Sequence, residues 1–280
     1  MTTAHPPQTD RVSSAPLAVF VATRAEMKPI ATALPPTRQS AHRSDSIVRV
    51  ETGGRNLLLT RTGVGPDHAE AAARRLFEDT SIAAALSLGV TAGLDPELRT
   101  GDLVVADRVI LRRGSGQVLR RDPQQRPHRA GDSTLESVSC DSGLQDAAVT
   151  VIQRWNSRYC LGPILTVDRI VLTAEDKRRL AAESGATALD MESAAIAFAA
   201  AARSIPFLAV RGVLDTVDED ITVGFDQFLN GHGEPQPLPL MRYLITHPFA
   251  VPYLIGLGVR TKAICARLGL LLQALSTTLS

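Results

Sequence analysis

Two short segments of the sequence place ionisable side chains among small and apolar residues. The first, 188–195, reads Ala-Leu-Asp-Met-Glu-Ser-Ala-Ala and contains Glu192. Further along, Arg211 and Asp215 follow the apolar run 207–210. Ionisable groups are costly in such surroundings unless they are paired or used in chemistry. Because acids with shifted pKa values in clefts often serve acid–base catalysis, this pattern indicates an enzyme.

The elements that must position these residues alternate between strands and helices. Strands, several of them continuous apolar runs typical of buried strands, are predicted at 17–22, 46–50, 56–61, 83–88, 103–106, 162–172 and 207–213. Helices are predicted at 67–78, 144–155, 175–184 and 191–202. The fold class expected from this alternation is α/β, a single-domain three-layer α/β/α sandwich with a central mixed sheet. Ligands of such sheets collect at the carboxyl ends of the strands.

The composition is that of a folded protein. Apolar residues make up 44%, charged residues 21% and the formal net charge is +1, which excludes a disordered chain and gives no indication of a nucleic-acid partner. Three cysteines are an odd number without metal-ligand spacing, so we expect a reducing, cytoplasmic location and no metal site. The polar start lacks the pattern of a signal peptide, and residues 1–15 are interpreted as a mobile tail.

Two other segments differ from the predicted core. Residues 112–142 are polar and are interpreted as a long surface insertion, and whether it forms a lid stays open. Residues 233–280 are expected to form a C-terminal helical extension. From 235 onward it has no Asp or Glu and several basic residues, while Pro248 and Pro252 argue against a membrane-spanning helix. It is interpreted either as helices packed on the core or at a subunit interface, or as an amphipathic element on an anionic membrane surface.

Four motifs, in the family's order over residues 17–220, resemble the purine nucleoside phosphorylase and nucleosidase superfamily, whose members cleave N-glycosidic bonds of nucleosides. They are Val21–Glu26, Thr62–Gly65, Gly89–Leu94 with Gly101–Val105, and Asp190–Glu192 with Arg211 and Asp215. Within that superfamily, Gly162–Asp168 and its spacing to Asp190 are most similar to hopanoid-associated phosphorylases, which are implicated in releasing adenine from adenosylhopane, a lipid-linked nucleoside. The resemblance implies a nucleoside phosphorylase-like catalytic domain over 16–232 and a homo-oligomer.

The resemblance also implies roles for the ionisable residues. Asp215 would be the general acid that protonates N7 of the purine, which requires a raised pKa; alternatively it caps a strand end or pairs with Arg211. Arg211, counted among the catalytic residues, is expected to orient Asp215 or a neighbouring carboxylate. Glu192 would bind the ribose hydroxyls. Met191 would pack against the ribose, or belong to the core.

The nucleophile is less clearly indicated. Glu26 aligns with the water-activating glutamate of nucleosidases, and Arg24 would suit a phosphate site; either could instead be an exposed charge at a helix start. Gly63 and Gly65 permit close backbone approach to an anion or ribose. Thr91 is expected to line the same pocket.

Several departures from the family pattern bear on the substrate. Ser87 stands where phosphorylases usually carry an arginine, and the loop from Gly89 lacks two adjacent glycines, which both favour water over phosphate. Ile170 lies in the expected base-binding region, which has no stacking aromatic residue. No cofactor is expected, with phosphate open as a co-substrate.

The sequence thus predicts cleavage of the N-glycosidic bond of a purine nucleoside, adenine in particular, by phosphate or water. The favoured substrate is a lipid-linked adenosyl compound such as adenosylhopane, met by peripheral contact of 235–280 with the inner membrane surface. One alternative is a soluble methylthioadenosine or adenosylhomocysteine nucleosidase with the C-terminal segment as a dimer interface. Another is a non-catalytic nucleoside-binding protein on the same fold.

Overall fold

The computed structural model describes residues 15–34, 40–41, 46–113, 134–225, 228, 230, 234 and 236–278. All but Ala15 of the predicted N-terminal tail lies outside the described residues. The strands are β1 (Leu17–Val21), β2 (Ser40–Ala41), β3 (Ile47–Thr52), β4 (Arg55–Arg61), β5 (Ala84–Gly93), β6 (Leu103–Arg113), β7 (Thr134–Ser139), β8 (Tyr159–Thr166), β9 (Ala188–Asp190) and β10 (Phe207–Asp215). The helices are α1 (Arg24–Ala33), α2 (Pro66–Asp79), α3 (Ser142–Arg154), α4 (Ala174–Ser184), α5 (Ser193–Ala201), α6 (Pro237–Thr246) and α7 (Ala250–Thr278).

The strands form one mixed sheet, as predicted. The order runs β10-β6-β8-β9-β5-β1-β4-β3-β2, and β7 pairs with β6. Strand β10 pairs in parallel with β5 and in antiparallel with β6. Because this double pairing joins the ends of the run from β5 to β10, five strands close into a barrel-like ring, which the sequence did not predict.

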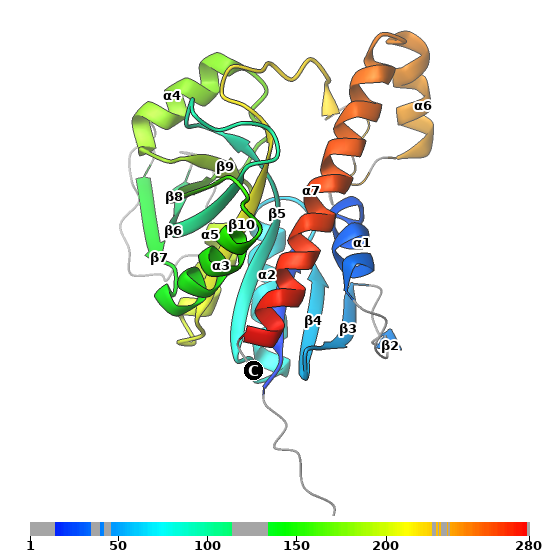
Figure 1. Cartoon of the computed structure of the whole chain (residues 1–280). Helices are drawn as coiled ribbons and strands as arrows, with labels where there is room; N and C mark the ends of the chain where they lie inside the picture. Colours follow the sequence, from blue (N-terminus) through cyan, green and yellow to red (C-terminus); the bar gives the residue numbers. More distant parts are fainter. Residues whose placement is uncertain are drawn as a thin grey trace, which may run out of the picture.

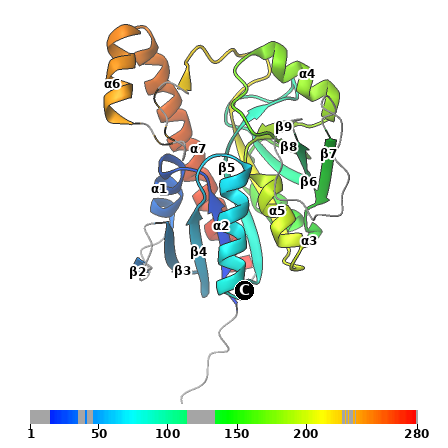
Figure 2. The same cartoon turned by 180° about the vertical axis from the view of Figure 1, so that it is seen from behind.

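Helices cover both faces of the sheet. In Figure 1, α1 and α7 lie in front of the strands, and the reverse view in Figure 2 brings α2 and α5 to the front. The strands between these helices are buried along nearly their whole length; β1 and most of β5 and β10 are inaccessible to solvent. This explains why they read as continuous apolar runs rather than as alternating ones.

The two halves of helix α7 have different surroundings. The second half belongs to the main core, and its buried residues are Ile264, Cys265, Leu268, Leu271, Leu272 and Leu275. It lies so close to β10 that a methyl group at Gly212 would overlap Ile264. The first half, together with α6, extends beyond the ends of the strands, at the top of Figure 1. Within the described part of the chain, no helix is both long and apolar enough to cross a bilayer.

Some predicted boundaries are wrong. The segment 112–142 is not wholly an insertion, because β6 continues to Arg113, β7 occupies 134–139 and α3 begins at Ser142; residues 114–133 lie outside the described part. The strand expected to reach residue 172 ends at Thr166. The residues just after it are freed from the sheet and contribute to the cavity described next.

Candidate active site

A cavity of about 880 Å³ lies at the carboxyl ends of the central strands. Its polar side is built from the start of α1, the end of β5, the segment from β9 into α5 and the end of β10. Its apolar side is built from the loop after β8, the side chains of Ile221, Phe225 and Phe228, and helices α6 and α7. The size and the apolar lining with a few convergent polar groups are typical of small-molecule sites.

Glu26 is held in the cavity wall by its position in helix α1. Thr23 is the N-cap, and Glu26, three residues later, closes a capping box: the backbone amide and hydroxyl of Thr23 donate to its Oε2 at 3.0 and 2.9 Å. The amide of Val90 donates to Oε1 at 3.0 Å. With 5% of its surface exposed, Glu26 is a fixed, buried carboxylate and not an exposed charge at a helix start.

Arg24 lies at the rim of the same cavity, with 66% of its side chain exposed. Its Nε lies 3.3 Å from Oε1 of Glu234, and Arg61 also pairs with that carboxylate. The guanidinium predicted to bind phosphate therefore already has an acidic partner, and its role in substrate binding stays a prediction.

Glu192 is the N-cap of helix α5 and lines the cavity, with 6% of its surface exposed. The amide of Gly65 donates to its Oε1 at 3.0 Å. Gly65 has φ of 100°, a conformation that favours glycine and aims this amide at the carboxylate. Gly65 thus acts on Glu192, and Gly63 is likewise in the left-handed region with φ of 88°. Burial raises the pKa of Glu192, and the positive charge of Arg211 opposes that rise.

Arg211 organises the carboxylates beneath the cavity. Its NH2 lies 2.8 Å from Oδ2 of Asp190 and 3.8 Å from Oε2 of Glu192. It also donates to the hydroxyls of Ser87 and Ser193, at 2.8 and 2.9 Å. Of the two predicted roles, Arg211 therefore has the second: it orients neighbouring carboxylates. Ser87, in place of the arginine of phosphorylases, is one of its hydrogen-bond acceptors.

The absence of a side chain at Gly89 leaves space for the side chains of Arg211 and Glu26. A methyl group there would overlap the Arg211 guanidinium and come within 2.6 Å of Oε1 of Glu26. Arg211 and Glu26 thus approach each other across a strand position that only glycine can fill. Their proximity connects Glu26 with Asp190 and Glu192, the two carboxylates that Arg211 approaches.

Asp215 borders the other side of the cavity and pairs with Lys177, not with Arg211. Burial raises the pKa of Asp215, and the hydrogen bond from Lys177 opposes that rise. Sequence reasoning missed Lys177, which is fully buried on α4. The available signal was its spacing, three residues after Ala174 and three before Leu180, on the buried stripe of an otherwise polar helix.

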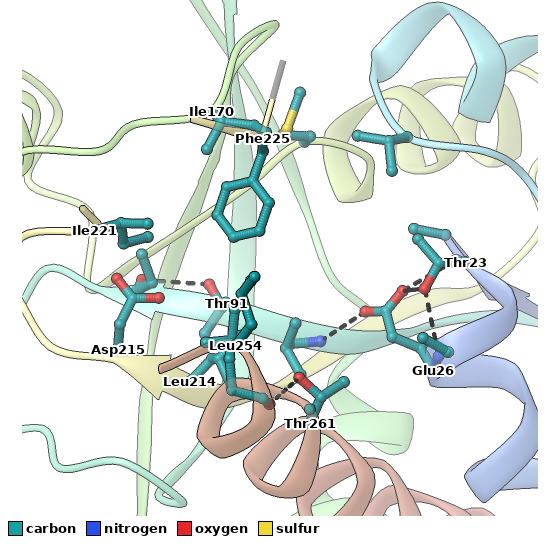
Figure 3. A pocket seen from close by; sticks show the side chains of 18 of the residues that line it. Thr23, Glu26, Thr91, Ile170, Leu214, Asp215, Ile221, Phe225, Leu254 and Thr261 are labelled. Carbon is teal, nitrogen blue, oxygen red and sulfur yellow. Dashed lines mark hydrogen bonds between the residues drawn. The ribbon is translucent and has the colours of Figure 1, made fainter. Parts of the chain in front are cut away.

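Figure 3 shows Asp215 and Glu26 on opposite sides of the pocket, with Thr91 between them. Thr91, Met191 and Ile170 all line the cavity, and their roles in substrate binding stay predictions. The hydroxyl of Thr91 donates to the carbonyl of Leu189 at 2.7 Å, so its oxygen keeps its capacity to accept a hydrogen bond. Phe225 points into the pocket from above (Figure 3). It supplies an aromatic ring that the predicted base-binding region lacked.

The described residues contain no group of three or more His, Cys, Asp or Glu side chains placed to hold a metal ion. The cysteines Cys140, Cys160 and Cys265 are free thiols, and none of them lines the cavity. The polar side chains on the cavity wall are carboxylates, the hydroxyls of Thr23, Thr91 and Thr261, and the guanidinium groups of Arg24 and Arg169. This set can donate a proton on one side, activate water on the other and bind hydroxyls between them.

Comparison with known proteins identifies the family of the chain. Residues 16–233 match the model of the phosphorylase superfamily. The 5′-methylthioadenosine/S-adenosylhomocysteine nucleosidase of Mycobacterium bovis is 27% identical over 208 residues, covering 67% of this chain and 80% of that protein. The enzyme of the same name from Tolumonas auensis is 28% identical over 183 residues, covering 65% of this chain and 77% of its own.

Solved structures share the fold at lower identity. A putative nucleosidase of that name from Francisella philomiragia superposes with a TM-score of 0.67 at 18% identity, covering 94% of this chain and 98% of that one. The Neisseria meningitidis nucleosidase in complex with methylthio-immucillin-A gives 0.64 at 17% identity, covering 93% and 99%. The match over most of the chain shows the family: this protein is an enzyme of the phosphorylase superfamily, to which nucleoside phosphorylases and nucleosidases belong.

Proposed function

We propose that the protein hydrolyses the N-glycosidic bond of a purine nucleoside, releasing the base, with adenine as the favoured base. The observation that carries the proposal is the placement of Asp215 and Glu26 on opposite sides of one cavity (Figure 3), which Glu192 also lines. A ribosyl group bound to Glu192 would have the purine toward Asp215 and C1′ within reach of a water held by Glu26.

The chemistry follows from these positions. Breaking the C1′–N bond leaves positive charge on the sugar and negative charge on the purine. A protonated Asp215 neutralises the purine by donating to N7. Glu192 binds the ribose hydroxyls, and its ionised form, which the positive charge of Arg211 favours against the effect of burial, stabilises the cationic sugar. Glu26 accepts a proton from a water molecule while the oxygen of that water attacks C1′. Arg211 and Asp190 fix Glu192 in place.

Water is favoured over phosphate by two features of the site. Ser87 is committed to Arg211. Arg24, at the start of α1, and Arg61 share the carboxylate of Glu234. A phosphate ion would have to displace that carboxylate, whereas a water needs only the Glu26 carboxylate. The curated relatives named above are nucleosidases as well.

The 5′ substituent decides between two candidate substrates. The relatives support a soluble thioether nucleoside such as methylthioadenosine or adenosylhomocysteine. The cavity supports a larger apolar group, because α6 and α7 extend its wall with Leu240, Leu244, Val251, Leu254 and Ile255. A lipid-linked adenosyl compound such as adenosylhopane would place its apolar part along that wall.

The outer surface of the α6–α7 tip fits the lipid-linked candidate. Leu238, Met241, Ile245 and Phe249 are exposed by 56–95%, and residues 235–280 contain no acidic side chain. An apolar, acid-free tip beside the cavity would contact an anionic bilayer and receive the substrate from it. A truncated protein that ends at residue 235 would not test this contact, because it would also remove the residues of α7 that belong to the main core. Instead, changing the four exposed residues to serine should abolish flotation with anionic liposomes, while equal flotation would exclude this contact.

The substrate is tested by adenine release from adenosine, methylthioadenosine, adenosylhomocysteine and adenosylhopane, each with and without phosphate. Release without phosphate supports hydrolysis, and the ranking of the four kcat/KM values identifies the 5′ group. A non-catalytic binding protein would bind these nucleosides without releasing adenine. Asp215→Asn separates the two cases, because an enzyme loses turnover while its affinity stays within a few-fold.

A further inference from the structure

Lys177 is placed where it can control the proposed acid. We propose that Lys177 is a positioning residue: its ammonium group holds one carboxylate oxygen of Asp215 and leaves the other free to donate a proton to the purine. This inference rests on the proposed function, in which Asp215 is the acid. It adds a residue from α4, an element outside the four motifs, to the machinery of the reaction.

The geometry fixes the lysine completely. Its Nζ donates to Oδ2 of Asp215, to the carbonyl of Thr216 at 2.9 Å and to the carbonyl of Glu219 at 2.7 Å. These three bonds use all three N–H groups of an ammonium ion. The side chain is fully buried, so it has no water to exchange for these partners. Asp215 Oδ2 is therefore held in one place, and the carboxyl group has one orientation relative to the cavity.

This arrangement serves the proton transfer at both stages. Before the reaction, the proton sits on Oδ1 of Asp215 while Lys177 bonds to Oδ2. As the C1′–N bond breaks, the Oδ1–H bond breaks as well, and the proton passes to N7 of the purine. The carboxylate that remains is buried, and an unpaired buried carboxylate would be costly. The Lys177 ammonium neutralises it, and water returns a proton after the base leaves.

Other charged groups also face this pair. Glu219 lies on the loop after β10, and Tyr253 and Arg260 approach from α7. Arg260 lies 4.0 Å from Glu219, so these two charges largely offset each other at Asp215. Lys177 is the cation in direct contact with Asp215, and it lowers the pKa of Asp215. Burial has the opposite effect and raises that pKa. Removing Lys177 should therefore leave a weaker acid with a still higher pKa.

The test compares Lys177→Met with Arg178→Met, which removes a positive charge from an exposed neighbour on the same helix. The pH profile of kcat/KM for adenine release is measured for both variants and for the wild type. Activity needs protonated Asp215 and falls as pH rises through its pKa. We expect Lys177→Met to move this alkaline limb upward by about one pH unit or more and to lower kcat by roughly 10²-fold, with KM within a few-fold. Arg178→Met should match the wild type.

Two controls make each outcome decisive. In an Asp215→Asn background, Lys177→Met should cost no further activity, because it acts through Asp215; full additivity of the two losses would overturn the inference. If Lys177→Met does not fold by circular dichroism, Lys177→Gln, which keeps hydrogen-bond donors without the charge, is used with the same expectation. An unshifted profile in the folded variant, with Asp215→Asn inactive, refutes the role of Lys177 alone. No adenine release by the wild type refutes the proposed function instead.

Discussion

The backbone amide of Val90 donates a 3.0 Å hydrogen bond to the carboxylate of Glu26, and this contact joins the start of α1 to the end of β5. It holds the carboxylate as an acceptor facing the cavity. Glu26→Gln keeps the shape but cannot accept a proton from water, so kcat should fall by roughly 10²- to 10⁴-fold with little change in KM. Steady-state adenine release measures both. Activity within a few-fold of the wild type would remove Glu26 from the mechanism.

A methyl group at Gly89 should damage the site from within the strand. It would overlap the Arg211 guanidinium and press on Glu26. We therefore expect Gly89→Ala to lower kcat/KM by at least about tenfold and to destabilise the fold by about 1–3 kcal/mol, as overpacking does. Gly256→Ala, on α7 with open space around the glycine, is the matched control; it should leave kcat/KM unchanged and stabilise the fold by at most about 1 kcal/mol, since alanine favours a helix over glycine. Chemical denaturation and adenine release give the two readouts, and equal behaviour of the variants would contradict this close approach.

Arg211→Met should be more damaging to stability than any surface charge change. It would leave the buried carboxylates of Asp190 and Glu192 without their cation, and breaking a buried pair in this way costs about 3–5 kcal/mol. Arg74→Met, which breaks an exposed pair with Glu70, should cost at most about 1 kcal/mol. Urea denaturation compares the two variants directly. Similar unfolding free energies would mean that Arg211 does not stabilise the carboxylates.

The sequence was sufficient for most of the core elements and for the main residues on the polar side of the cavity. Continuous apolar runs predicted the buried strands, and Glu26, Glu192, Thr91 and Asp215 all border one cavity. The partner of Asp215 was not predicted, because Lys177 comes from a helix whose contact depends on how the chain folds back. The closure of the ring by β10 was missed for a similar reason, since one strand pairing with two others leaves no local sequence pattern.

The apolar side of the cavity wall could not be predicted from the sequence either. Residues of α6 and α7 face the cavity, yet their composition alone fitted a core, an interface or a membrane surface. Phe225, more than fifty residues beyond the predicted base-binding region, supplies an aromatic ring by tertiary packing. Such contacts join segments that are far apart in the sequence, and no local sequence pattern predicts that they meet.

The apolar wall gives a prediction about substrate preference. Leu254 lines the cavity from α7, whereas Val259 on the same helix is 63% exposed and does not line it. Leu254→Asn should lower kcat/KM for nucleosides with long apolar 5′ groups by about tenfold more than for adenosine, because it puts a polar amide where an apolar group binds. Val259→Asn should affect neither substrate. A uniform loss with Leu254→Asn would argue against this wall as the 5′ site.

The most direct test of the account is adenine release by the wild-type protein with and without phosphate, alongside Glu26→Gln and Asp215→Asn. We predict release at the same rate in both conditions, with free sugar as the second product and almost no turnover by either variant. A strict requirement for phosphate with a sugar phosphate as product would contradict hydrolysis and assign Arg24 to phosphate binding. No release from any nucleoside of the panel would contradict the proposed function itself.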